Sequence, residues 1–417
     1  MRQCIIVAAL MLWQPVVAAT PASAVENFIL GAQTEVASPE GAGQQIPGMS
    51  GLSSWVDELQ LRQKTESTIN PFASGASTAY EFRLTPKAWG QRAAEQEVLR
   101  VREEQLDAQS KNALNGALYR RYLVLLELFA QRATAQLLIV SSGLLEGEVQ
   151  INRSLVGGRE FSAKKLLDAE VALARSQGLA AISLRRLNAL RVQLNLPPET
   201  EVQVLSENKP DWLIDHRQIR QTIGQEVSLE QLPTVTRSRL EAQRISFEAD
   251  ATKARQRLGI VSLSAEFVVG VSNSNSSDNR SQFMVSVNIP LGSDNFKSID
   301  SGYALREAQA AYQQRQAVDM HSLGLMKSSM LQSLQEWELV QASLQKNAVR
   351  LATPAVKTDP ELALTLRTEQ VRQLKELAEV EQKTVAAYID YLYLSGLLAE
   401  QPLRNWIRQG GPAIPLS

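Results

Sequence analysis

The chain has 417 residues, and 43 Lys and Arg side chains nearly balance 44 Asp and Glu side chains. This balance excludes functions that depend on a strong overall charge, such as attraction to nucleic acid. Aromatic residues make up only 6% of the chain, and the abundance of Gln, Ala, Leu, Ser, Glu and Arg favours long helices over a compact enzyme.

Residues 1–24 have the pattern of a secretory signal peptide. Arg2 supplies the positive start, and Ile5–Trp13 form an apolar core that is too short to span a bilayer as a helix. Ala22-Ser23-Ala24 form a small-residue cleavage site, with Val17-Ala18-Ala19 as a second choice. We therefore expect an exported protein.

Two further expectations concern what the exported chain lacks. The only cysteine, Cys4, lies in the signal segment, so we expect neither a disulfide nor thiol chemistry in the mature protein. No later run of about eighteen apolar residues stands out, so we expect no transmembrane helix. If the chain crosses a membrane, the sequence predicts that it does so as β-strands.

The first half of the exported chain, residues 25–225, begins with a stretch rich in Gly, Ser, Pro and Ala over 25–52, for which we expect an irregular arm. Apolar and polar positions then alternate in two segments over 53–85, which is the pattern of half-buried β-strands. A turn-like stretch at 69–77 separates them. Pro86 ends the second strand because proline has no N–H to donate.

A helical hairpin is predicted for residues 87–195. Apolar residues recur at spacings of three and four as far as about Arg153, which indicates one helix about 100 Å long at 1.5 Å per residue. Gly157-Gly158 break it, and a return helix ends before Pro197. Such helices must lie in a coiled coil or a bundle wall. Residues 199–225 predict a short crossing segment.

The second half, residues 226–400, repeats this order. We predict a helix over 228–258, two strands over 260–290 and a second helical hairpin over 297–398. Residues 401–417 contain several Pro and Gly and predict a loose tail.

The doubled order of strand, polar loop, strand, proline and long helix is the strongest architectural signal in the chain. Pro86 and Pro290 occupy matching points of the two copies. Each strand is about as long as a tilted strand needs to be to cross an outer membrane. The predicted fold class is therefore mainly α with β, built from two tandem repeats of a β-hairpin and a long helical hairpin.

The sequence around the first helix break resembles that of the TolC family of outer-membrane efflux and secretion channels. The run from Arg153 to Gly158, followed by Ser162, Leu166-Leu167, Asp168-Ala169-Glu170 and Leu173-Ala174, is similar to the family's helix-turn-helix pattern at the periplasmic tip. The run from Leu258 to Asn288 is similar to the family's passage from helix to strand. The resemblance covers roughly residues 50–400.

The resemblance implies a homotrimer that forms a twelve-stranded β-barrel in the outer membrane of a Gram-negative bacterium, on a periplasmic tunnel of coiled-coil helices. It implies the passive exit duct of a tripartite efflux or type I secretion system. An inner-membrane transporter would drive that duct through a periplasmic adaptor, and outer-membrane lipid would surround the barrel. It implies no catalytic residue, cofactor, metal or nucleic-acid partner. Members of the family have a helix before the first strand, and we expect no such helix in residues 25–52.

The resemblance also places two groups of residues at the periplasmic end. The predicted adaptor-contact residues are Leu155, Val156, Gly157, Gly158, Asp359 and Pro360. The residues predicted to close the tunnel aperture are Arg153, Asp168, Lys357, Arg367 and Glu369. For each residue the alternative is a plain helix turn or a solvated charge at a helix end.

Two sets of residues in the strand regions carry further expectations. An aromatic set, which could line the membrane surface or simply pack, consists of Trp55, Tyr80, Phe82, Trp89 and Phe296. A charged set would have to face the lumen if the first hairpin crosses lipid, and consists of Glu58, Arg62, Glu81 and Arg83.

No pattern in the chain favours an enzyme. His216 and His321 lie far apart without neighbours at ligand spacing, so we expect packing or surface roles for both. No phosphate loop, nucleophile elbow or carboxylate constellation is seen. Two other readings stay open: a periplasmic adaptor, which has a single helical hairpin between lipoyl-like halves, and a structural coiled-coil envelope protein without a pore.

Overall fold

The computed structural model describes residues 21–36, 55–70, 73–158, 161–196, 214–255, 259–272, 277–288, 295–354, 356 and 359–408. The elements are α1 (Pro21–Val36), β1 (Val56–Asn70), β2 (Ala73–Pro86), α2 (Gln91–Ser154), α3 (Ala163–Gln193), α4 (His216–Gly224), η2 (Leu229–Gln231), α5 (Pro233–Arg255), β3 (Gly259–Ser272), β4 (Ser277–Asn288), α6 (Asn295–Leu351), α8 (Pro360–Ser395) and α9 (Leu397–Glu400). The expected class, mainly α with β, is confirmed.

The chain divides into two compact units, each drawn from both halves of the sequence. The sheet unit comprises residues 39–111 and 228–321, and the helical unit comprises residues 1–38, 112–227 and 322–417. The long helices α2 and α6 contribute their first parts to the sheet unit and their remainders to the helical unit.

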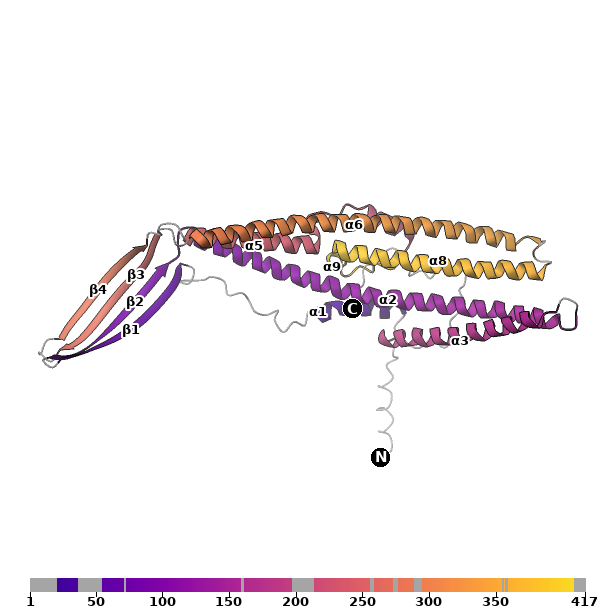
Figure 1. Ribbon diagram of the computed structural model, residues 1–417, viewed down its shortest axis with the longest axis horizontal. Helices are drawn as coiled ribbons and strands as arrows, with labels where there is room; N and C mark the ends of the chain where they lie inside the picture. The colour runs from indigo at the N-terminus through magenta and orange to yellow at the C-terminus, as the bar shows by residue number, and fades with distance from the viewer. Residues whose placement is uncertain are drawn as a thin grey trace, which may run out of the picture. The chain divides into compact units, whose positions relative to one another are not determined.

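The sheet unit contains one antiparallel four-stranded sheet with the strand order β1-β2-β3-β4 (Figure 1). The hairpins β1–β2 and β3–β4 come from different halves of the sequence, and they join where Tyr80 of β2 faces Phe267 of β3. Both predicted hairpins are therefore confirmed, and pairing between them makes a single surface.

The strands of the first hairpin are longer than expected. β1 runs to Asn70 and β2 begins at Ala73, with these two residues paired. A turn was predicted over residues 69–77, and this prediction is wrong for residues 69–70 and 73–77, which belong to the two strands. Residues 71 and 72 lie outside the described residues. The small polar residues there have little intrinsic strand preference, so the pairing with the neighbouring strand decides their conformation.

Helix α5 connects the first parts of α2 and α6 within the sheet unit. Gln105 of α2 donates a hydrogen bond to Glu241 at 3.0 Å, and Thr234 donates one to the buried Asp319 of α6. The helix predicted from residue 228 begins instead at Pro233, after the short turn η2. Proline suits the first turn of a helix because its missing N–H would have no partner there.

In the helical unit, α3 returns along the later part of α2 (Figure 1). Small buried residues of α3 recur every seven positions, at Ala169, Ser176 and Ser183. The hydroxyl of Ser176 lies 2.9 Å from the hydroxyl of Ser142 on α2. Small side chains with local hydrogen bonds let the two helices approach closely, which explains why the predicted hairpin folds back on itself.

The core of the helical unit lies where α8 meets α2 and is rich in tyrosine. The side chains of Tyr122, Tyr388 and Tyr391 are almost completely buried. Tyr119 of α2 donates a hydrogen bond to Asp390 of α8 at 2.8 Å, which ties the two helical hairpins together.

Residues 25–36 were expected to be part of an irregular arm, and this expectation is wrong. They belong to helix α1, whose Ile29 and Ala32 are fully buried. The guanidinium of Arg121 on α2 lies 4.9 Å from the Phe28 ring centroid and donates to the Phe28 carbonyl. A Cβ on Gly31 would lie 2.6 Å from that guanidinium, so glycine makes room for it. Residues 37–54 lie outside the described residues.

The C-terminal residues 401–408 were expected to form a loose tail, but they are packed. Asn405, Trp406 and Ile407 are buried, and Tyr122 donates a hydrogen bond to the Arg404 carbonyl at 3.0 Å. Arg408 forms an ion pair of 2.7 Å with Glu26 of α1, so the segment 401–408 and α1 lie beside each other. The Pro and Gly content predicted a loose tail, because composition does not show how much a single buried tryptophan stabilises the segment around it.

One helix bears on the expectation that the chain has no transmembrane helix. Within the described residues, α2 is long and apolar enough to cross a membrane by length and composition, with an 18-residue window that is 28% buried. An unbroken apolar run is absent, but a window with at most 2 charged residues exists. A long wall helix that packs on several partners has the same composition.

We predict that Arg121→Ala loosens α1. The change removes the contacts with Phe28 and an ion pair of 3.2 Å with Glu35, and should lower the opening free energy of α1 by about 2 kcal/mol. Hydrogen exchange of residues 25–36 should rise accordingly.

Arg120→Ala is the matched control, because Arg120 makes an exposed ion pair with the same Glu35 and surface pairs contribute little. Equal exchange in the two variants would contradict the role assigned to Arg121.

Candidate functional site

One face of the sheet is mostly apolar, with Gln63 opposite Tyr80 as a polar exception. Directly opposed residues of antiparallel strands share a face, and the register gathers apolar side chains on the same side. These are Leu59, Leu61, Tyr80, Phe82, Leu84, Leu263, Ala265, Phe267 and Val285. Leu61 is 75% exposed and Leu59 is 61% exposed. A soluble sheet buries such a face against a core, so an exposed one fits a contact with lipid or with another chain.

The opposite face is polar and charged. Arg62 faces Glu81, which in turn faces Glu266, and Gln60 faces Arg83, which in turn faces Ser264. The four charged residues that were predicted to share the lumenal side, with Glu58 as the fourth, therefore do lie on one face. The two faces together have the apolar-outside, polar-inside pattern of a membrane barrel strand.

The sheet has two open edges. β1 and β4 are the outermost strands of the order β1-β2-β3-β4, so each lacks a strand partner on one side among the described residues. A row of unpaired backbone N–H and C=O groups is a template for pairing with another chain.

A charged network joins the base of the sheet to the helices. Glu95 of α2 accepts from Lys87 at 2.6 Å and from Gln91 at 2.8 Å. Arg255, the last residue of α5, lies 3.2 Å from Glu95 and 3.3 Å from Asp57 of β1. Gln91 is buried and also donates to Asp57 at 3.1 Å. This junction network holds the start of one sheet edge to two helices.

The electrostatics of the junction network centre on Glu95. Partial burial by itself would raise the pKa of this carboxyl. The hydrogen bonds from Lys87 and Gln91 and the charges of Lys87 and Arg255 act the other way, and the net result is a pKa below the usual glutamate range. Glu95 is therefore held as a carboxylate that links the surrounding cations.

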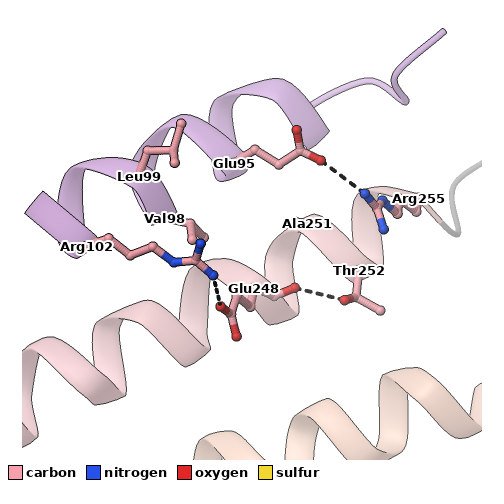
Figure 2. A pocket seen from close by; sticks show the side chains of 8 residues that line it. All are labelled: Glu95, Val98, Leu99, Arg102, Glu248, Ala251, Thr252 and Arg255. Carbon is pink, nitrogen blue, oxygen red and sulfur yellow. Dashed lines mark hydrogen bonds and ion pairs between the residues drawn. The ribbon is translucent and has the colours of Figure 1, made fainter. Parts of the chain in front are cut away.

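A pocket of about 320 Å³ lies beside this network, between α2 and α5 (Figure 2). Figure 2 shows Glu95 directed toward Arg255 at one end and Arg102 directed toward Glu248 at the other. The pocket-lining residues are Glu95, Val98, Leu99, Arg102, Glu248, Ala251, Thr252 and Arg255. Two ion pairs and the apolar residues Val98, Leu99 and Ala251 thus line the pocket.

The first hairpin tip contains the predicted adaptor-contact residues 155–158. Val156 is 60% exposed, whereas Leu155 is half-buried. Gly157 has a φ of +88°, which favours glycine, and this conformation allows the sharp end of α2. Ser162 caps α3 by accepting from the Lys165 N–H. The tip therefore presents one apolar side chain on a tight turn.

Arg153, an aperture candidate at this tip, is paired within its own hairpin. Its guanidinium lies 2.7 Å from Glu170 of α3. Asp168, the other candidate on α3, is exposed and makes no contact with Arg153 among the described interactions. The structure thus brings Arg153 to Glu170, a residue that the family pattern contained but that was not predicted as a site residue.

At the second tip, Asp359 is a helix cap. Its carboxylate accepts from the Leu362 N–H at 3.1 Å, and α8 begins at Pro360. Glu369 pairs with Arg372 one turn later at 2.7 Å, and Arg367 is exposed. Lys357 lies outside the described residues. The aperture roles of these residues stay predictions.

The aromatic set divides into two places. Tyr80 and Phe82 belong to the apolar face, while Trp55 and Trp89 lie at the base of the sheet with 65% and 91% exposure. The Arg92 guanidinium lies 4.3 Å from the Trp55 ring centroid. The side chain of Phe296 lies outside what the structure describes.

The two histidines differ in environment. His216 is buried and stacks on Trp337 of α6 at 3.9 Å between ring centroids, whereas His321 is exposed. Among the described residues, no group of three or more His, Cys, Asp or Glu side chains could hold a metal ion.

Sequence reasoning missed the junction network entirely. Its residues come from β1, from the segment before α2, from α2 and from α5, so no local motif contains them. The available signal was modest: Gln91 and Glu95 lie one helical turn apart at the start of α2.

Comparisons with known proteins rest on structure alone. No family model matches the chain, and no curated protein matches it. Among solved structures, the chain is similar to CusC, whose report concerns folding and transmembrane channel formation, with 13% identity and a TM-score of 0.58. The match covers 90% of this chain and 89% of CusC.

Two further outer-membrane proteins match equally well. VceC of Vibrio cholerae has 12% identity and a TM-score of 0.57 over 89% of this chain and 92% of VceC. The CmeC outer membrane channel of Campylobacter jejuni has 12% identity and a TM-score of 0.56 over 90% of this chain and 84% of CmeC. The chain therefore has the TolC-type fold that the sequence pattern indicated.

We predict that Glu95→Gln makes the sheet unit less stable at neutral pH and less sensitive to acid. Because the folded-state pKa of Glu95 is lowered, its stabilising effect is complete above the ordinary pKa of about 4.3. It is lost as the pH falls through the lowered value.

The measurement is the urea midpoint of the purified protein at pH 7 and at pH 3. The difference between wild type and Glu95→Gln should be clear at pH 7 and should shrink at pH 3. Glu97→Gln, which removes an exposed pair with Arg100, is the control and should change little at either pH. A pH-independent difference would refute the assignment.

Proposed function

We propose that this chain is one subunit of a passive outer-membrane exit duct that serves an efflux or type I secretion system. The observation that carries the proposal is the sheet: four strands of 12 to 15 residues with one exposed apolar face, one charged face and two open edges. Its setting in a TolC-type fold supports the same reading.

The open edges favour a closed assembly. In a bilayer every unpaired backbone group costs several kcal/mol, so an isolated four-stranded sheet does not suit lipid. Pairing of β1 in one copy with β4 in the next removes both edges. Three copies give twelve strands, wide enough to enclose a water-filled lumen. The charged residues of the polar face, such as Arg62 and Glu81, would then line that lumen.

The proposed role is transport without catalysis. An inner-membrane transporter would supply the energy and select the cargo, and a periplasmic adaptor would connect it to the hairpin tips. Val156 on its tight turn supports such a contact, because an exposed apolar side chain at a helix end can enter a partner's groove. The proposed location is the outer membrane of a Gram-negative bacterium, with the helices in the periplasm.

The two alternative readings fit the molecule less well. An adaptor has one helical hairpin, whereas this chain has two, α2–α3 and α6–α8. In a structural coiled-coil protein without a pore, the apolar face of the sheet would be exposed to water at Leu59 and Leu61, which is unfavourable.

We predict that Leu61→Lys weakens the barrel and that Gln60→Lys does not. The two residues are neighbours on β1, but Leu61 lies on the apolar face and Gln60 on the polar face. A lysine facing lipid should cost about 2 kcal/mol. The measurement is electrophoresis of outer-membrane extracts with and without boiling.

The wild type and Gln60→Lys should run as a detergent-stable trimer that shifts on boiling, and Leu61→Lys should give less trimer. A monomer that a carbonate wash releases from the membrane would exclude the duct. Equal loss of trimer in both variants would contradict the assignment of the two faces.

We also predict that Val156→Asp impairs export but leaves the trimer intact, because a charge at the tip weakens an apolar adaptor contact. Val192→Asp is the matched control, since Val192 is 65% exposed at the other end of the same hairpin. The measurement is tolerance to a panel of antibiotics and metal ions in a deletion strain that carries each variant. Full rescue by Val156→Asp would rule out a tip contact at this residue.

A further inference from the structure

The two edge strands of the sheet keep a fixed register to each other through the strands between them. A line drawn across the strands from Leu59 of β1 passes through Leu84 and Leu263 and reaches Val285 of β4. In the proposed duct, β4 of one copy pairs with β1 of the next, so this cross-strand line continues from Val285 into the next copy. The β1 residue that it meets there defines the register of the closed surface.

The alternation of side chains restricts that residue. Val285 lies on the apolar face of the sheet, and the β1 residues of the same face are the odd-numbered ones, such as Leu59, Leu61 and Gln63. Successive side chains of a strand point to opposite faces, so a displacement by an odd number of residues would turn the apolar face of one copy toward the lumen. The next copy is therefore displaced from Leu59 by an even number of residues.

Closure of the barrel restricts the size of the displacement. Three identical copies contribute equally, so displacements of two, four or six residues correspond to shears of six, twelve or eighteen. Eight strands with a shear of eight tilt by about 36°. The tangent of the tilt follows the ratio of shear to strand number, so twelve strands with a shear of twelve tilt by the same angle. Shears of six and eighteen give about 20° and about 47°, outside the usual range of about 35 to 45°. The displacement is therefore four residues.

The loop ends of the edge strands fix its direction. Asn70, the last residue of β1, lies eleven residues beyond Leu59, whereas Ser277, at the loop end of β4, lies eight residues from Val285. Hairpin loops that leave the same membrane surface lie at one level, so the cross-strand line climbs by three residues over the three steps from β1 to β4. The fourth step, into the next copy, brings the climb to four residues and the line to Gln63.

The extent of pairing agrees with this direction. With the displacement toward the loops, residues 278–288 of β4 face residues 60–70 of β1, so all but one of the twelve residues of β4 are paired. The same displacement in the opposite direction would pair only residues 277–284 with 56–63. The longer pairing removes more unpaired N–H and C=O groups from lipid, and each such group costs several kcal/mol there.

We propose that adjacent copies pair with Gln63 of β1 opposite Val285 of β4 on the outer face, and with Lys64 opposite Met284 on the lumenal face. All four residues are exposed in the single chain, as a contact between copies requires. This register rests on the proposed function, which supplies the closed trimer. It adds the specific contact through which one copy recognises the next.

The test is disulfide cross-linking in isolated outer membranes. The only cysteine, Cys4, lies in the predicted signal segment, so cysteines introduced in pairs have no competitor in the mature chain. The two registered variants are Gln63→Cys with Val285→Cys, and Lys64→Cys with Met284→Cys. Successive opposed pairs alternate between Cα separations of about 5.5 and about 4.5 Å, and a disulfide accepts both.

The matched controls combine Val285→Cys with Leu61→Cys or with Thr65→Cys. These residues share the outer face with Gln63 but lie two positions out of register, so the Cα atoms are about 7 to 8 Å apart. That separation is too long for a disulfide unless the backbone moves. Within one copy, β1 and β4 are three strand spacings apart, about 14 Å, so a bond at any of these pairs joins two copies.

With copper phenanthroline and air as the oxidant, both registered variants should give a covalent trimer that survives boiling without reductant. They should give at least about tenfold more of it than the controls. Under reductant, each variant should show the heat-modifiable trimer of the wild type. Co-expression of the single variants Gln63→Cys and Val285→Cys should give a covalent dimer through the same contact, which keeps the test decisive if a double variant does not assemble.

Two results would overturn the register. One is a covalent trimer that forms as readily with Leu61→Cys or Thr65→Cys as with Gln63→Cys. The other is a heat-modifiable trimer in which neither registered variant, nor the co-expressed pair, forms a cross-link. The failure of the proposed function is distinct, because it shows as the absence of a heat-modifiable trimer of the wild type before any oxidation.

Discussion

The unpaired edges of the sheet are the constraint on which the rest of the molecule depends. A sheet whose apolar face is exposed suits lipid, but lipid does not tolerate open backbone edges. In the proposed duct, pairing with further copies satisfies both conditions. The alternation along β1 and β2, the pairing of Tyr80 with Phe267 and the separation of charged from apolar side chains would all suit such a closed surface.

The helices need a rigid attachment to the sheet, and the junction network provides it. Asp57 stands on the edge strand, Glu95 on α2 and Arg255 on α5, so one set of ion pairs connects elements from both halves of the sequence. A strand that pairs with a neighbouring copy would transmit its position to two helices through these contacts. The exposed tryptophans Trp55 and Trp89 and the pocket between α2 and α5 lie at the same end of the sheet.

The fold was largely predictable because its elements are long and periodic. Strand alternation and helical spacing identified β3, β4, α2, α3, α6 and α8 within a few residues of their observed ends. The first tip was placed by the break at Gly157-Gly158. The charged residues Glu58, Arg62, Glu81 and Arg83 could be assigned to one face, because the side-chain period of a strand is two residues.

Contacts between segments far apart in the sequence could not be predicted from local patterns and became visible only in the tertiary structure. Helix α1 forms because Arg121 docks on Phe28 and Gly31, and residues 405–407 are ordered because Tyr122 and its neighbours bury them. The composition of either segment indicates the opposite. The sequence by itself determined the elements and their repeated order, since these depend on local periodicity. The tertiary structure decided the docked ends, the junction network and the pocket, since those free energies arise only when residues far apart in the chain meet.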